Sequence, residues 1–123
     1  VMDGNLQRAL HVMERLREGG TEDAGLLAFL LGAYRRLAPV VDLVEEGAPP
    51  EQIAAAMGNA GRYAGLRDRA IARARALGGD GLCRAYDLMV EADRTSKTGE
   101  VKDDLALEIA VMRLTALSAP ARR

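Results

Sequence analysis

Few residues of this sequence have the type and spacing needed for catalysis. The chain has 123 residues but only one histidine, His11, and one cysteine, Cys83. His11 falls opposite the apolar stripe of the first expected helix, so we expect a solvated surface residue. Cys83 has no histidine near it in sequence, and we expect a buried, inert thiol. Metal sites need clustered histidine, cysteine or carboxylate ligands, so the sequence predicts neither a metal nor another cofactor.

Motifs for phosphate binding and hydrolysis are also missing. The stretch Thr95–Gly99 superficially resembles a phosphate-binding loop. It lacks the upstream glycines of GxxxxGK[ST], and it follows an expected helix rather than a strand. Neither G-x-S-x-G nor H-E-x-x-H occurs. We therefore expect no catalytic residue, no nucleotide binding and no enzyme activity.

Asp93 is an acid on the expected inward stripe of a helix. It lies four residues after Met89 and seven after Tyr86. Burying an unpaired carboxylate is costly, so Asp93 needs a partner. Lys97 lies one turn further along the helix and can reach it, and the first amides of the last helix are a second possible partner. We expect a structural pair of Asp93 with Lys97 rather than a catalytic acid.

Three arginines are candidates for a binding surface. At about 100° per residue, Arg62, Arg69 and Arg73 project along one edge of the fourth expected helix. They form either a basic stripe for an acidic partner or phosphate, or an ordinary solvated face. We favour the solvated face, because scattered surface charge is common.

The elements that would carry these residues are all helices. Alanine and leucine dominate, and β-branched residues never alternate with polar ones over the length of a strand. Apolar periodicity, glycine pairs and prolines divide the chain into six helical segments. They cover about 5–18, from Thr21 to before Gly47, 50–57, 61–77, 80–96, and from Asp103 or Asp104 to about Leu117. The sequence thus predicts an all-α fold, a single helical bundle of about five to six helices.

Particular residues are expected to begin or bend these helices. Thr21 and Asp80 are expected N-caps, and Pro39 should kink or break the second helix, with a kink favoured because the apolar period resumes after it. We expect Tyr63 and Leu66 to point inward from the fourth helix. Beyond the last helix, Pro120 and the terminal Arg122 and Arg123 should be loose.

The last expected helix has two apolar faces where one would suffice for a terminal helix. Leu105, Ile109, Met112 and Ala116 make one face, and Leu107, Val111 and Leu114 make the other. We expect the first face to be core. The second then contacts either a neighbouring subunit or a neighbouring helix of the same bundle.

Overall composition excludes several classes of protein. The net charge of −1 and pI near 5.9 give no reason to expect binding to nucleic acid or an anionic membrane. A single cysteine permits no intrachain disulfide, so we expect a cytoplasmic protein. No apolar run approaches the roughly 20 residues that cross a bilayer. Since the chain opens at Val1 without a signal sequence, we expect one domain over residues 1–123, cut from a longer protein.

Two stretches near the end carry a resemblance to a known family. The residues 92–99, ADRTSKTG, followed by DLALE at 104–108, resemble the closing pattern "aD…K-[ST]-G…LE" of the delta subunit of bacterial DNA polymerase III. The opening residues 3–6, DGNL, and the helix–glycine–helix stretch from Leu16 to Leu37 are similar to the upstream part of the same region. The resemblance covers nearly the whole chain but only the last third of a typical family member.

This resemblance implies a helical collar-like oligomerisation domain of the clamp loader, which loads the sliding clamp onto primed DNA. It implies the gamma/tau and delta-prime subunits as partners through the collar, with no nucleotide bound by this domain. The expected interface residues are Leu107, Val111, Leu114, Arg62, Arg69 and Arg73. The alternatives are a helical DNA-binding regulator, although the fourth helix lacks Asn or Gln beside its arginines, and a self-associating bundle unrelated to replication.

Overall fold

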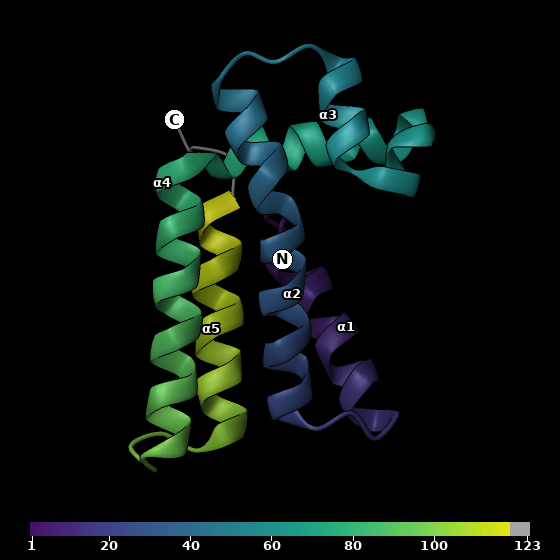
Figure 1. The fold of residues 1–123 in the computed structure, drawn as a ribbon. Coiled ribbons are helices and arrows are strands. Elements are labelled where there is room, and N and C mark those ends of the chain that lie inside the picture. Colours follow the sequence, from purple (N-terminus) through teal and green to yellow (C-terminus); the bar gives the residue numbers. More distant parts are fainter. Residues whose placement is uncertain (119–123) are drawn as a thin grey trace.

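The computed structural model describes residues 1–118 and consists of helices joined by short loops (Figure 1). Their order is α1 (Leu6–Glu18), α2 (Asp23–Glu45), α3 (Pro50–Ala56), the short 3-10 helix η1 (Gly58–Arg62), α4 (Ala64–Lys97) and α5 (Asp103–Ser118). No strand occurs among the described residues, and the all-α prediction is confirmed. Pro120, Arg122 and Arg123 lie outside the described residues.

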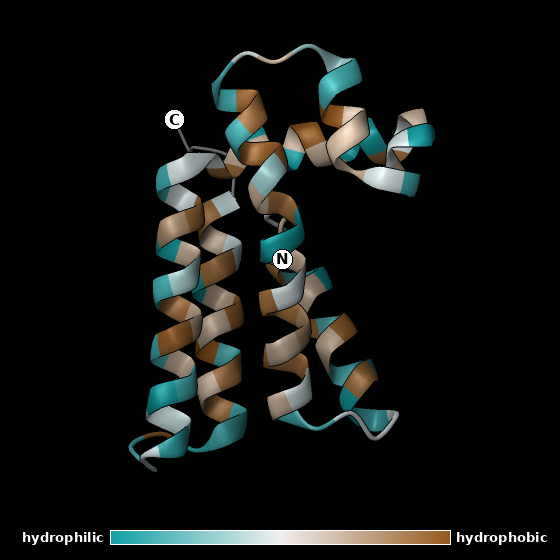
Figure 2. Cartoon of the chain, in the orientation of Figure 1, coloured by the Kyte–Doolittle hydropathy of each residue, from teal (hydrophilic) through white to brown (hydrophobic). Residues whose placement is uncertain are grey.

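The long helices lie side by side and enclose the core. The second part of α4 runs antiparallel to α5 (Figure 1). The second helix, α2, packs against both α4 and α5, and α1 contacts α5. The beginning of α4 turns away from α5 and packs with η1, next to α3. Apolar residues face inward between the helices (Figure 2). Tyr34, Val41 and Leu114 are completely buried at the centre of the main core cluster.

The second helix begins later than expected. Asn5 caps α1 by accepting a hydrogen bond from the Arg8 amide at 3.0 Å. Glu22 precedes α2 and makes no side-chain cap, so the predicted Thr21 cap is wrong. The Thr21 amide instead donates to the Leu16 carbonyl at 3.0 Å and closes the end of α1. The N-cap of α2 is therefore Glu22, one residue later than expected, and the helix begins at Asp23.

Pro39 does not interrupt α2. The helix is continuous from Asp23 to Glu45, with Pro39 inside it. Proline removes one hydrogen bond to the preceding turn, here the bond to the Arg35 carbonyl. Pro39 and Arg35 are both exposed, so water can take the place of the missing donor. The helix therefore continues through Pro39 to Glu45 without a break.

The expected fourth and fifth helices form one element, α4, with a sharp bend at Gly78. Gly78 has φ 68° and ψ 171°, a conformation that only glycine adopts easily. The Gly79 amide donates to Glu45 Oε1 at 2.5 Å, so a carboxylate from the end of α2 caps the second half of α4. The predicted Asp80 cap is wrong. The actual cap lies 34 residues away in sequence, where local spacing gives no sign of it.

The 3-10 helix η1 was not expected from the sequence. A Cβ at Gly61 would lie 2.0 Å from the Ala54 carbonyl oxygen, so only glycine allows η1 to approach α3 this closely. Arg62 ends η1, and α4 begins at Ala64. The fourth helix thus begins three residues later than expected. Tyr63 is 64% exposed and Leu66 is 42% exposed, so the prediction that both point inward is wrong.

By length and composition alone, α2 could cross a membrane. This differs from the expectation that no segment reaches the required length. In the folded chain Tyr34, Leu37 and Val41 of α2 are buried in the core, and Arg35 and Arg36 are exposed near its middle. A helix that contributes one face to the core of a folded domain passes the same test of length and composition, and α2 contributes such a face.

The bend at Gly78 predicts different effects for two Gly→Ala substitutions in α4. Gly78→Ala should lower the free energy of unfolding by about 1–3 kcal/mol, because alanine is strained at this positive φ. Gly65→Ala in the first turn of α4 keeps an ordinary helical φ, and its Cβ would meet only the end of the Arg69 side chain at 3.9 Å, so the substitution should be neutral or slightly stabilising. Urea unfolding followed by circular dichroism measures both. Equal effects of the two substitutions would contradict the strain at Gly78.

Candidate interaction surface

The face of α5 that was expected to lie in the core is largely exposed, and the other apolar face is buried. Leu107, Val111 and Leu114 are 3%, 3% and 0% exposed and lie in the core of the domain itself. Leu105 and Met112, expected in the core, are 49% and 50% exposed. Of the other two residues on that face, Ile109 is half-buried and Ala116 is exposed. The prediction that Leu105, Ile109 and Met112 form the core is wrong.

Small residues explain why the core lies on this side of α5. Ala106 and Ala110 are buried, and they line the same groove between α4 and α5 as Ala92 of α4. Alanine side chains allow two helices to approach closely, and the larger Val111 and Leu114 then fill the space beside the contact. In the sequence, Ala106 and Ala110 therefore indicate which face of α5 is buried.

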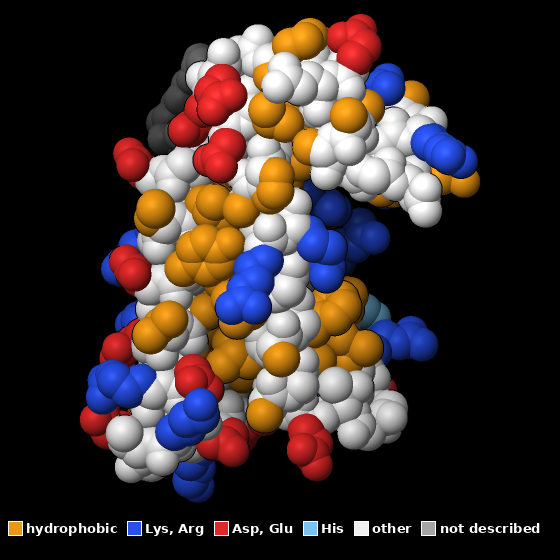
Figure 3. Space-filling view, viewed as in Figure 1, with side chains coloured by type: hydrophobic (Ala, Val, Ile, Leu, Met, Phe, Trp, Pro, Cys, Tyr) orange, Lys and Arg blue, Asp and Glu red, His pale blue; other side chains and the backbone are white. Residues whose placement is uncertain are grey.

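A stripe of apolar side chains is consequently left on the outside of α5. We define the α5 outer stripe as Leu105, Ile109, Met112 and Ala116, which follow one another at helical spacing. In the space-filling view, hydrophobic side chains gather over the region of α5 and the neighbouring seam with α2 (Figure 3). A second apolar group lies near α1 (Figure 3). Exposed apolar residues that cluster in this way are typical of interaction sites.

The three candidate arginines do not form one edge of a helix. Arg62 lies in η1, before α4 begins. Arg69 Nε donates back to the Gly65 carbonyl at 3.3 Å, and Arg73 Nε lies 3.0 Å from Asp3 Oδ1. The hydrogen bond from Arg73 lowers the pKa of the Asp3 carboxyl below its usual value. The prediction of a single stripe along α4 is wrong.

Asp93 and Lys97 lie near the surface at the corner between α4 and α5. Lys97 Nζ is 2.9 Å from Asp93 Oδ2, and the two side chains are 74% and 51% exposed. The expected inward position of Asp93 is wrong, because Met89 and Ala92 occupy the buried face. Beside this pair, Ser96 donates to Asp103 across the loop, and Arg94 contacts both Glu91 and Glu100. These exposed contacts define the corner without a buried charge.

The structure places His11 as expected from the sequence but not Cys83. His11 is exposed, as expected. Cys83 is also exposed, so the predicted buried thiol is wrong, because the inward positions of this turn are taken by Leu82 and Ala85. No group of three potential metal ligands occurs within residues 1–118.

Arg17 is a structural residue that the sequence reasoning missed. Its guanidinium lies 2.8 Å from Asp23 Oδ1 and 3.1 Å from Glu108 Oε1, and it donates to the Asp104 carbonyl at 3.2 Å. The hydrogen bond to Asp23, with the one to Glu108, raises the pKa of Arg17. One side chain thus joins the end of α1 to the beginnings of α2 and α5. The only local signal was an arginine and an aspartate on either side of the turn at Gly19.

Comparison with known protein families gives a match over most of the chain. The family model described as DNA polymerase III delta subunit, C-terminal domain, matches residues 1–114. No curated protein and no solved structure matches the chain. The matched residues contain all of α1 to α4 and most of α5.

The burial of α5 predicts that neighbouring substitutions differ sharply. Val111→Asp places an unpaired carboxylate in the core and should unfold the domain. Met112→Asp, one residue further on the exposed side, should change the free energy of unfolding by no more than about 0.5 kcal/mol. Circular dichroism and thermal melting distinguish the two. A folded Val111→Asp protein would show that this side of α5 is not core.

The exposed geometry of Asp93 predicts a small effect on stability. Asp93→Ala should cost about 0.3–0.5 kcal/mol, the usual contribution of an exposed pair four residues apart on a helix. The loss should disappear in 1 M NaCl, because salt screens surface charges. Chemical unfolding at low and high salt provides the measurement. A loss of several kcal/mol would mean that the carboxylate is buried.

Proposed function

Because the chain belongs to the family of the C-terminal domain of the DNA polymerase III delta subunit, we propose that it is a non-catalytic assembly domain of a bacterial clamp loader. The family implies a role in the clamp loader, which supports loading of the sliding clamp in DNA replication. We propose the collar domains of the gamma/tau and delta-prime subunits as its partners, in the cytoplasm. Residues 1–123 then act as one helical collar domain.

The α5 outer stripe is the observation that carries this proposal. Leu105 and Met112 are each about half exposed although the opposite side of the same helix supplies core residues. Fully burying an exposed leucine or methionine side chain contributes about 1.5–3 kcal/mol, so covering the exposed half of Leu105 or Met112 contributes about 1 kcal/mol each. This stripe replaces Leu107, Val111 and Leu114 as the candidate contact on α5, since those residues already fill the domain core.

The arrangement of the arginines supports assembly over DNA recognition. A DNA-binding regulator needs several cationic side chains that reach phosphates from one face. Arg69 and Arg73 instead make contacts within the chain, with Gly65 and Asp3. Arg62 lies on a separate element. The self-associating bundle would use the same α5 outer stripe, and the experiment below separates it from clamp-loader assembly.

The experiment replaces Leu105 and Met112 together by aspartate. The double variant should remain folded, because both residues are exposed. Its association with the gamma/tau and delta-prime collar domains should weaken at least tenfold, the effect of losing apolar contacts at the centre of an interface. Analytical ultracentrifugation of the mixture, together with circular dichroism of the variant alone, gives both results.

Tyr63→Asp is the matched control. Tyr63 is also exposed and apolar, but it precedes α4 and lies away from the α5 outer stripe. Aspartate is a favourable residue at this N-cap position, so the control should fold and assemble normally. Unchanged assembly of the Leu105/Met112 variant would disprove the proposed contact. Self-association of the unsubstituted chain that is lost in that variant, without binding to the other subunits, would favour the self-associating bundle.

A further inference from the structure

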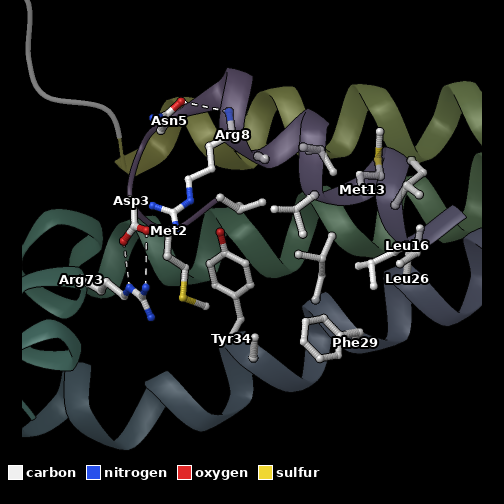
Figure 4. A pocket seen from close by; sticks show the side chains of 17 residues that line it. Met2, Asp3, Asn5, Arg8, Met13, Leu16, Leu26, Phe29, Tyr34 and Arg73 are labelled. Atoms are coloured by element: carbon white, nitrogen blue, oxygen red, sulfur yellow. Dashed lines mark hydrogen bonds and ion pairs between the residues drawn. The ribbon is translucent and has the colours of Figure 1, made fainter. Parts of the chain in front are cut away.

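A pocket of about 290 Å³ opens between α1 and α2 (Figure 4). Its walls are mainly apolar and include Val12, Met13 and Leu16 from α1 and Leu26, Phe29 and Leu30 from α2. Phe29 and Val12 are 65% and 47% exposed, so apolar surface continues from the pocket to the outside of the domain. The volume is close to the lower end of the range for pockets that bind small molecules.

The inner end of this pocket contains a buried polar group without a partner. Tyr34 is 0% exposed, and its hydroxyl has no hydrogen-bond partner within the described residues. The hydroxyl points to the end of the pocket where Arg8 and Met2 lie (Figure 4). A buried polar atom left unpaired costs about 1–3 kcal/mol. The cost would be removed by a ligand that brings a hydrogen-bond acceptor to this end.

The same end of the pocket carries positive charge. Arg73 is paired with Asp3 at 3.0 Å, which offsets its charge. Arg8 also lines the pocket and makes no salt bridge within residues 1–118, although its charge also acts on the Asp3 carboxylate. The burial of Tyr34 raises the pKa of its hydroxyl to about 12, so near neutral pH the group remains a proton donor. Donor and cation together suit an anionic acceptor.

We propose that this pocket binds a small amphipathic carboxylate. The carboxylate accepts a hydrogen bond from the Tyr34 hydroxyl and pairs with Arg8, and the apolar body lies against Met13, Leu16 and Phe29. Met2 lies beside the tyrosine ring, and its flexible side chain can move to admit the head group (Figure 4).

A helix of a partner protein is the competing occupant. Such a helix would lie across the rim and cover Phe29 and Val12. Its backbone would remain outside the pocket, whereas the Tyr34 hydroxyl is fully buried at the inner end. The polar inner end therefore favours a small molecule that enters the pocket.

Octanoate is a suitable probe, with octanol and butyrate as comparisons. Titration of the 123-residue chain, followed by NMR of the methyl groups lining the pocket, should show saturable one-to-one binding of octanoate. Octanol has the same apolar tail as octanoate but no charge, and it should bind at least tenfold more weakly. Butyrate has the charge but a tail too short to reach along the apolar walls, and it should also bind weakly. Tyr34→Phe and Arg8→Gln should each reduce octanoate affinity about tenfold, the loss of one hydrogen bond to a charged group.

Tyr34→Phe retains the buried ring, so its thermal midpoint should be unchanged or higher, which separates loss of binding from loss of fold. Leu105→Ala removes an exposed apolar group from the α5 outer stripe and should leave octanoate binding unchanged. Absence of saturable octanoate binding would overturn the proposal. Equal affinities for octanol and octanoate, or for the unsubstituted chain and both pocket variants, would do so as well. None of these results depends on clamp-loader assembly.

Discussion

The hydrogen bond from the Gly79 amide to the Glu45 carboxylate determines how the two ends of the fold meet. At Gly78 the backbone enters a region that other residues avoid, and this bends α4 between Leu77 and Gly79. The part before the bend packs with η1, and the part after it pairs with α5. Glu45 ends α2, so the same contact fixes α2 against the bend. The core cluster that joins α2, α4 and α5 depends on this arrangement.

Local sequence patterns predicted the elements better than their contacts. Glycine pairs, prolines and apolar periodicity placed every α-helix within a few residues, because these signals act within one turn. The cap of the second half of α4 could not be found in this way, since Glu45 and Gly79 are distant in sequence. The 3-10 helix η1 depends on the close approach of Gly61 to Ala54, which is also a tertiary contact.

The choice between the two faces of α5 shows a different limit of sequence reasoning. Both faces contain large apolar residues, so periodicity alone does not distinguish them. The buried alanines at 106 and 110 decide the matter, because they bring α4 and α5 close together. A similar competition for the inward side of α4 placed Asp93 at the surface, since Ala92 fits the close contact. In the candidate sites, small residues carried more information than the large and charged ones on which the prediction relied.

The contact of Arg17 with Glu108 has a consequence for how the domain is made. The two residues are 91 positions apart, and the smaller core cluster joins Ala9 and Met13 of α1 to Leu107 and Val111 of α5. A ribosome produces α1 first, at about 5–20 residues per second. The first helix therefore waits several seconds before α5 emerges, and Ala9 and Met13 remain uncovered by α5 in the meantime. During synthesis, the contact between α1 and α5 therefore cannot form until the intervening helices have been made.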